Sequence, residues 1–196
     1  MISIRITNVT ASGNLFINVN VDELVEKDFC RRFKENKHKK NRNFHGVIYS
    51  NQLASAHIYK NGKFNIMGAK SRREVQDTCD EICQMLRIRS ARDITFNNFC
   101  ATTSCGCLIP RNEVFDFLRI QPETKSVFLE PELFPAIRWN FHDFGSTVSF
   151  FRTGKINSTG NKTETEAVNS LLLALKMLHR VSHLFSCAVF VTFSVQ

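Results

Sequence analysis

The sequence lacks any apolar run of the ~18 residues that a membrane-spanning helix requires, so we expect no membrane partner. Its start, MISIRITNV, lacks the basic segment and the apolar segment that together mark a signal peptide. Apolar residues are not scarce: they make up 43% of the chain, against 22% charged residues, which argues against general disorder. We therefore expect a folded globular protein without a membrane role.

Acidic residues are in deficit, with 18 Asp and Glu against 26 Lys and Arg, which gives a net charge of +8. A basic protein of this kind commonly has a polyanionic partner, and nucleic acid is the most frequent one. Most of the charge lies in residues 31–43, where seven basic residues and one acidic residue account for about six of the eight net charges. This run is either a contact for a polyanion or a solvated loop, and both readings stay open.

No common zinc-binding pattern is present among the seven cysteines, which are odd in number and scattered through apolar segments. We interpret them as reduced packing residues of an intracellular protein. Cys105 and Cys107, with Cys100 nearby, could hold a metal, but no histidine lies beside them. Paired carboxylates or a Cys/His arrangement typical of an enzyme are also lacking. We therefore expect no metal, no other cofactor and no catalytic residue.

The chain contains an internal repeat of roughly 90 residues. Gly62-Lys63 recurs 92 residues later as Gly154-Lys155. The motif Gly68-Ala69-Lys70-Ser71-x-x-Glu74 recurs at the same offset as Gly160-Asn161-Lys162-Thr163-x-x-Glu166. Several features at one offset are difficult to obtain by chance. We therefore divide the sequence into repeat 1 (residues 1–90), repeat 2 (residues 91–183) and an apolar, strand-like tail (residues 184–196).

Each repeat is predicted to contain several strands followed by a long amphipathic helix. Ser71 and Thr163 are good N-caps with a glutamate three residues later, and apolar residues follow them at helical spacing. The predicted helices are the long ones over 71–87 and 163–180 and shorter ones over about 21–30 and 111–118. Aromatic and β-branched residues predict strands over residues 2–10, 44–50, 55–60, 63–67, 94–102, 146–152 and 155–159.

Antiparallel strands backed by helices on one side predict an α+β fold in which the other face of each sheet is open. Two such sheets joined edge to edge by a pseudo-dyad make one curved surface with helices on its convex side. Core packing accounts for most of the 18 phenylalanines, but some aromatic side chains of the strands are predicted to face outward. Aromatic residues on an uncovered sheet need a partner, because large exposed apolar patches are rare in monomers. The open surface is therefore the expected binding surface.

One segment of repeat 2 is identical to a motif of a known family. Residues Glu130-Pro131-Glu132-Leu133-Phe134-Pro135 match the second stirrup of the TATA-binding protein letter for letter. Phe150-Phe151-Arg152-Thr153-Gly154-Lys155 resembles the hairpin of that family, and Phe134 and Phe151 keep its seventeen-residue separation. In repeat 1, residues 43–48 and 58–63 are the counterparts. The sequence thus resembles a divergent TATA-binding protein over about residues 3–182, which implies a saddle of two pseudo-symmetric repeats.

The resemblance implies two aromatic pairs that enter base steps of DNA. Phe134 and Phe151 match one pair, and Phe44 and Tyr59 match the other. An apolar wedge in a base step unstacks it and kinks the duplex, so that more protein contacts the minor groove. The alternative for all four residues is an ordinary place in the core.

The resemblance also implies residues that contact the groove floor and the phosphates. Asn8 and Asn98 match the two central asparagines of the family, whose amides suit the acceptor atoms of an A·T minor groove. Thr159 matches a groove-facing threonine, whose counterpart in repeat 1 is Met67. The lysines that match family residues near phosphates, where each contact adds salt-sensitive affinity, are Lys63, Lys70, Lys155 and Lys162.

Several positions depart from the family pattern. Tyr59 replaces a phenylalanine, and Asn65 and Asn157 replace groove-facing valines. Asn140 and Gly145 stand where the family has basic residues, whereas the first stirrup is replaced by the basic run 31–43. A strict preference for the TATA element is therefore not implied, and the electrostatic contacts are expected mainly at one end.

The resemblance implies a general transcription initiation factor that binds and bends double-stranded, AT-rich promoter DNA. Residues Glu130, Glu132 and Leu133 match those that contact a transcription factor IIB-like protein, and other initiation factors would bind the convex helices. The expected location is the nucleus, or a viral factory or virion if the source is a large DNA virus. The alternative is a protein scaffold that has lost specific DNA reading and binds or titrates initiation factors. An enzyme is the least supported reading.

Overall fold

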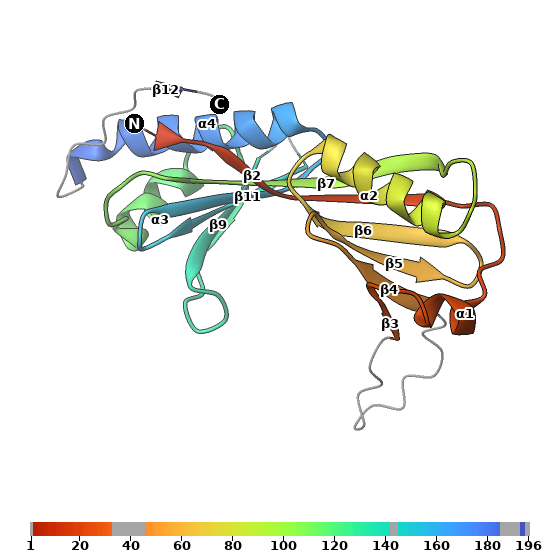
Figure 1. Cartoon of the computed structure of the whole chain (residues 1–196). Coiled ribbons are helices and arrows are strands. Elements are labelled where there is room, and N and C mark those ends of the chain that lie inside the picture. The colour runs from red at the N-terminus through yellow and green to blue at the C-terminus, as the bar shows by residue number, and fades with distance from the viewer. Residues whose placement is uncertain (1, 33–45, 142–144, 185–192, 195–196) are drawn as a thin grey trace. The chain divides into compact units, whose positions relative to one another are not determined.

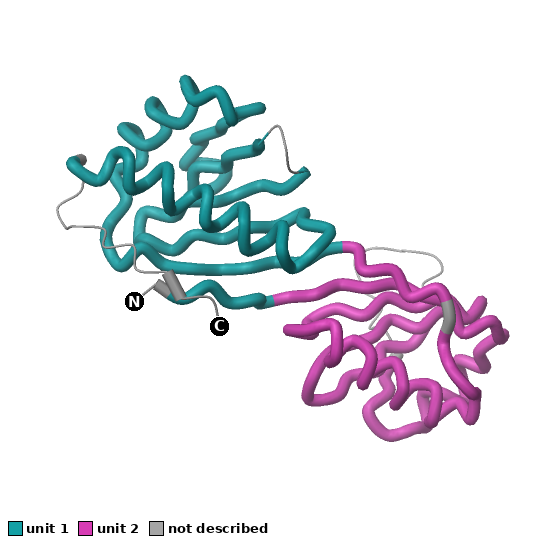
Figure 2. The backbone as a smooth tube through the Cα atoms, turned by 90° about the horizontal axis from the view of Figure 1, so that it is seen from above, with its two compact units in different colours: residues 1–7, 98–196 teal, residues 8–97 magenta. Residues whose placement is uncertain are grey.

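The computed structural model describes residues 2–32, 46–141, 145–184 and 193–194 (Figure 1). It comprises two compact units, which are unit 1 (Met1–Thr7 and Asn98–Gln196) and unit 2 (Asn8–Asn97), shown in Figure 2.

Two long strands contribute residues to both units. Strand β2 covers Arg5–Asn14 and strand β7 covers Arg92–Ser104, and the division between the units falls within each of them. The compact units therefore cross the boundary between the two sequence repeats.

Unit 2 is an antiparallel sheet with one long helix packed on it. Its further elements are α1 (Val21–Val25), β3 (Cys30–Arg32), β4 (Gly46–Ser50), β5 (Ser55–Tyr59), β6 (Lys63–Ala69) and α2 (Arg72–Met85). The strand order is β3-β4-β5-β6-β2-β7, with β2 contributing from Asn8 onward and β7 up to Asn97. Helix α2 packs against β6, and α1 lies beside β3 and β4 (Figure 1).

Unit 1 has the same plan. Its elements are α3 (Arg111–Arg119), β8 (Thr124–Phe128), β9 (Ala136–Phe141), β10 (Thr147–Phe151), β11 (Lys155–Asn161), α4 (Glu164–Arg180) and the 3-10 helix η1 (Ser182–Leu184). The order is β2-β7-β11-β10-β9-β8, with β7 contributing from Asn98. Helix α4 packs on β10 and β11, and α3 packs on β8 and β9.

A short parallel pair completes unit 1. Strand β1 (Ile2–Ser3) pairs with β12 (Phe193–Ser194), which belongs to the apolar tail. Most of the remaining tail lies outside the described residues. In the described part of the chain, no helix is long and apolar enough to cross a membrane.

The predicted α+β class, with antiparallel sheets backed by helices, is confirmed. The predicted helix caps are also confirmed, since the hydroxyls of Ser71 and Thr163 each accept a 3.1 Å hydrogen bond from the backbone N–H three residues later. The carboxylates of Glu74 and Glu166 accept from the N–H groups of Lys70 and Lys162, one residue before each cap. Both long helices therefore begin at stable, doubly capped ends.

Two predicted boundaries are wrong. The helix expected at about 21–30 ends after Val25, with Glu26 as its C-cap. Further along, Phe29 has a left-handed backbone (φ 65°) and Cys30 belongs to β3. The strand expected at 2–10 is divided into β1 and β2, and β2 extends to Asn14. Strands β3, β8 and β9 were not predicted from the sequence.

The repeated glycine-lysine hairpins are explained by backbone geometry. Gly62 (φ 78°) and Gly154 (φ 88°) both have a left-handed conformation that favours glycine. A Cβ atom at either position would collide with a backbone carbonyl, that of Ile17 or that of Cys107. Leu15 and Cys105 donate backbone hydrogen bonds to these two glycines, so each hairpin is joined to the loop after its long strand.

Candidate nucleic-acid interface

Each sheet has a buried face and an open face. In β10, Val148 and Phe150 are fully buried on the helix side. Thr147, Ser149 and Phe151, which alternate with them, are partly exposed. Strands β5 and β11 show the same alternation. In each unit, the side chains that face away from the helices form a candidate interface.

Two asparagines have the same environment in the two units. The backbone N–H of Gly68 donates a 2.7 Å hydrogen bond to Asn8 Oδ1, and that of Gly160 donates a 2.8 Å bond to Asn98 Oδ1. Because an N–H group must face an oxygen, both amides have a fixed orientation. Their Nδ2 groups, which are donors, therefore point away from these glycines. Asn98 Nδ2 makes a weak further contact, to Cys100 Sγ at 3.3 Å.

The second predicted aromatic pair is brought together. Phe134 precedes β9 and Phe151 ends β10, and their ring centroids lie 5.9 Å apart with an interplanar angle of 63°. Both rings are partly exposed. In the other pair, Tyr59 is a partly exposed residue at the end of β5, and Phe44 lies outside the described residues.

The floor of the open face is polar. In unit 1, Thr102 Oγ1 donates a 2.7 Å bond to Asn157 Oδ1, between strands β7 and β11. In unit 2, Asn65 Nδ2 lies 3.4 Å from the Tyr59 hydroxyl, and Asn97 Nδ2 donates to Ser12 Oγ at 3.0 Å. The valine-to-asparagine departures therefore place hydrogen-bonding groups where the family resemblance implied apolar ones.

Asn140 is held on both sides by hydrogen bonds. Thr147 Oγ1 donates to its Oδ1 at 2.6 Å, and its own Nδ2 donates to Ser126 Oγ at 2.8 Å. The amide thus joins strands β8, β9 and β10.

The predicted lysines are all exposed and occupy equivalent positions in the two units. Lys63 and Lys155 begin β6 and β11, and Lys70 and Lys162 follow the ends of these strands. Thr159 lies opposite Thr147 in the sheet and is exposed, and Met67 lies opposite Ser55. Of the basic run, only Arg31 and Arg32 are described, and both belong to β3.

The stirrup between β8 and β9 presents its side chains outward. The carbonyl of Glu130 accepts backbone hydrogen bonds from Leu133 at 3.0 Å and from Phe134 at 2.8 Å, which closes the turn. Glu132 is exposed, and Leu133 is 81% exposed. The turn therefore directs Phe134 toward Phe151 while Leu133 remains available to a partner.

Sequence reasoning missed Arg138. This exposed residue of β9 has its guanidinium carbon 5.6 Å from the Phe128 ring centroid and 5.7 Å from that of Phe134. The signal was present in the alternation of Ala136–Phe141, where buried Ile137, Trp139 and Phe141 imply that Arg138 faces the other way.

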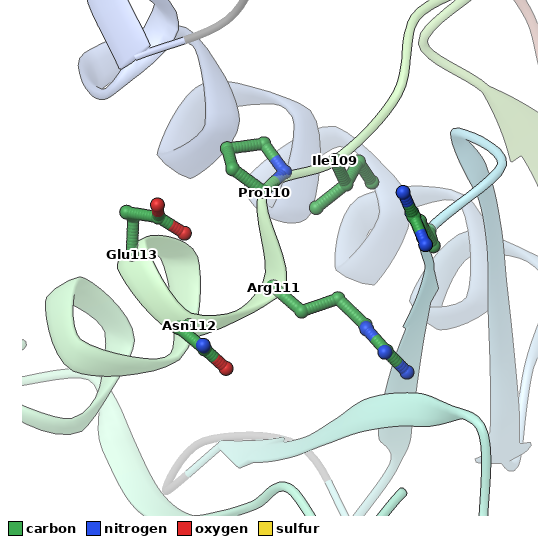
Figure 3. A pocket seen from close by; sticks show the side chains of 6 residues that line it. Ile109, Pro110, Arg111, Asn112 and Glu113 are labelled. Carbon is green, nitrogen blue, oxygen red and sulfur yellow. The ribbon is translucent and has the colours of Figure 1, made fainter.

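A polar pocket of about 200 Å³ lies beside the start of α3, and Figure 3 shows its lining. Arg111 and Arg152 line it together with Glu113. Arg111 Nη1 donates a 3.2 Å bond to the carbonyl of Pro135, next to the stirrup. This contact ties α3 to the segment that carries Phe134.

Two of the cysteines singled out in the sequence, Cys105 and Cys107, lie close together. Cys105 Sγ and Cys107 Sγ are 3.6 Å apart. Among the described residues, no group of three or more His, Cys, Asp or Glu side chains is arranged to hold a metal ion.

Comparisons with known proteins agree with this architecture. Residues 3–88 and 93–181 match the family model of "Transcription factor TFIID (or TATA-binding protein, TBP)". The TATA-box-binding protein of Thermococcus celer is 24% identical over 91% of this chain and 92% of its own length. The corresponding protein of Methanocaldococcus jannaschii is 26% identical over 92% and 96%. A solved structure titled "Methanococcus jannaschii TBP" has a TM-score of 0.71 and 23% identity, covering 91% of this chain and 99% of that one.

Both the predicted family and the predicted fold are therefore confirmed. Family members are DNA-binding transcription factors and not enzymes. The chain belongs to the TATA-binding protein family.

Proposed function

We propose that this protein is a general transcription initiation factor that bends the minor groove of promoter DNA by inserting aromatic wedges. The observation that carries the proposal is the pair of Phe134 and Phe151, two partly exposed rings 5.9 Å apart at one end of an open sheet face. Unstacking a base step costs a few kcal/mol, which the burial of such rings and the extra contacts of bent DNA offset.

The matched asparagines support binding to A·T-rich sequence. With Oδ1 bonded to a glycine N–H, Asn8 and Asn98 present Nδ2 donors. The minor groove of an A·T pair offers only acceptors, the N3 of adenine and the O2 of thymine. Each of these donors therefore suits an A·T pair.

The test is selection of bound duplexes from a random pool, followed by a bend measurement on the selected sequence. Fluorescence transfer between dyes at the two duplex ends should rise when the protein binds. Selected sites should be rich in A·T pairs. Binding without any change in transfer would contradict bending, and no selected sequence at all would contradict sequence-preferring binding.

The proposal includes recruitment of a IIB-like factor by the stirrup. Leu133 is the most exposed large apolar side chain among the described residues, and Glu132 beside it is exposed too. Glu132→Arg should abolish recruitment on DNA with little change in DNA affinity, because the turn is closed by the backbone carbonyl of Glu130. A Glu132→Arg protein that still recruits the factor would remove the stirrup from the proposal.

A second candidate is a protein scaffold without specific DNA reading. The polar floor at Asn65 and Asn157 favours it, because these side chains make hydrogen bonds within the sheet. The selection experiment separates the two candidates, since a scaffold would recover no preferred sequence. In either case the proposed place of action is the nucleus, or a viral factory or virion for a viral chain, and no catalysis is proposed.

A further inference from the structure

We propose that Arg138 is a DNA-contacting residue that both binds a phosphate beside the kinked base step and holds the Phe134 ring in place. The proposal rests on the proposed function and adds a residue to its interface. It begins with the open face of β9, where Arg138 and Asn140 are the two outward-facing polar side chains in the strand Ala136–Phe141.

Asn140 is not available to contact DNA, because the oxygen and the nitrogen of its amide make hydrogen bonds of 2.6 and 2.8 Å within the sheet. Arg138 differs in this respect. It is exposed, and no carboxylate of the described residues forms an ion pair with it. Arg138 is therefore the cation of β9 that is available to bind a DNA phosphate.

The position of the guanidinium links it to the wedge. Arg138 lies opposite Ser149 of β10 and Phe128 of β8, on the face that carries Phe151. Its guanidinium carbon is within 6 Å of the Phe134 ring centroid, at 5.7 Å, a distance at which cation–π attraction is significant. Phe134 in turn packs edge-on against Phe151.

The chemistry of the guanidinium permits both roles at once. Stacking on an aromatic ring uses the flat face of the group, whereas its five N–H donors lie in the plane and point outward. Those donors match two oxygens of one phosphate. When Phe134 enters a base step, the flanking phosphate is the nearest anion to a cation beside the ring.

The other unit offers a natural comparison. Ile48 stands 90 residues before Arg138 and lies opposite His57 of β5, as Arg138 lies opposite Ser149 of β10. Ile48 is nearly buried, at 9% exposure. Unit 2 thus has an isoleucine at the position that Arg138 occupies in unit 1, and isoleucine is a residue that this sheet position accepts.

The experiment uses the full chain and the duplex selected by the unmodified protein. Affinity is measured over a series of salt concentrations, and the bend is measured by fluorescence transfer, for Arg138→Ile, Arg138→Lys and Arg119→Ile. Arg119 is an exposed control at the end of α3, 3.7 Å from Asp116, and its loss removes the same charge on the helix side.

Arg138→Ile should lower the slope of log K against log salt by roughly 0.9, which corresponds to one phosphate contact, and should reduce the bend. Arg138→Lys should keep the slope but lose part of the bend, because an ammonium group has no flat face to stack on the ring. Arg119→Ile should change neither. An unchanged slope in Arg138→Ile would overturn the phosphate contact, and a full bend in both Arg138 variants would overturn the positioning role. If the unmodified chain binds no DNA, the proposed function itself fails, which is a different outcome from a bound but insensitive Arg138→Ile.

Discussion

The backbone N–H of Gly160 donates a 2.8 Å hydrogen bond to Oδ1 of Asn98. Gly160 has a left-handed backbone (φ 86°), which favours glycine at this position. Gly68 (φ 93°) makes the matching bond to Asn8 in the other unit. A glycine in each sheet thus fixes which end of an asparagine amide remains available to a ligand.

Asn98→Asp isolates the role of the amide donor. The carboxylate has the same shape and can still accept the bond from Gly160, so the unfolding midpoint should change little. It cannot donate to adenine N3 or thymine O2, and its charge opposes the phosphates. We expect at least a tenfold loss of affinity for A·T-rich duplex, or about 1.4 kcal/mol, in a binding titration. Normal affinity in the aspartate variant would exclude Asn98 from the groove contact.

The two aromatic pairs should contribute unequally to bending. Phe134→Ala with Phe151→Ala should remove most of the bend and cost tenfold or more in affinity, because both rings are apolar and unstacking must be offset by their burial. Phe44→Ala with Tyr59→Ala should cost less, since a phenol in a base step needs a partner for its hydroxyl. Tyr59→Phe should not weaken binding.

Fluorescence transfer on an end-labelled duplex measures both double variants. Phe117→Ala is the control, because Phe117 is a partly buried ring of α3 under the Arg180 guanidinium and not on the open face. Equal loss of bend in the two double variants would refute the asymmetry.

The basic run 31–43 should act as an electrostatic contact. Replacing Lys37, Lys39, Lys40 and Arg42, which lie outside the described residues, with serine should weaken DNA binding with little change in sequence preference. The slope of log K against log salt should fall by roughly 0.9 for each lost phosphate contact. Lys176→Ser, an exposed lysine of α4, serves as the control. A slope equal to that of the control would identify the run as a solvated loop.

Tyr49 should make the stability of unit 2 sensitive to alkaline pH. Its hydroxyl donates a hydrogen bond to Glu81 on α2, and burial followed by this glutamate raises the pKa of Tyr49 to about 12. Hydrogen bonds from Asn51 and Tyr49 lower the pKa of Glu81. A raised tyrosine pKa means that the folded state favours the protonated phenol. The corresponding stability is complete below the unfolded pKa of roughly 10 and is lost as the pH rises toward about 12.

Tyr49→Phe should therefore flatten the dependence of the urea unfolding midpoint on pH over that alkaline range. At neutral pH the variant should be less stable than the unmodified protein, because Glu81 loses a donor. The same alkaline decline in both proteins would assign the effect to other groups.

Features determined by neighbouring residues could be predicted from the sequence. The hydroxyls of Ser71 and Thr163 cap their helices by accepting a hydrogen bond from the backbone N–H three residues later. The hairpin at Gly62 requires only a local left-handed turn. The positive φ of Phe29, by contrast, could not be predicted, because bulky residues rarely adopt it.

Features that depend on strand register could not be predicted. The bond between Asn98 and Gly160 joins residues 62 apart, across a pair of strands whose register shifts between Ser158 and Asn161. Neither a motif nor a periodicity encodes that shift. Arg138 was missed for a related reason, since its meaning depends on two phenylalanines that β8 and the stirrup bring beside it.

The division of β2 and β7 between the units has a consequence for synthesis on the ribosome. The sheet of unit 2 needs residues up to Asn97, so it is not complete when the ribosome has finished the first repeat. Residues before Asn8 are translated well before Asn98, yet their neighbours in unit 1 are among the residues from Asn98 onward. In the nascent chain, this segment must therefore remain without its unit 1 neighbours until the second repeat is translated.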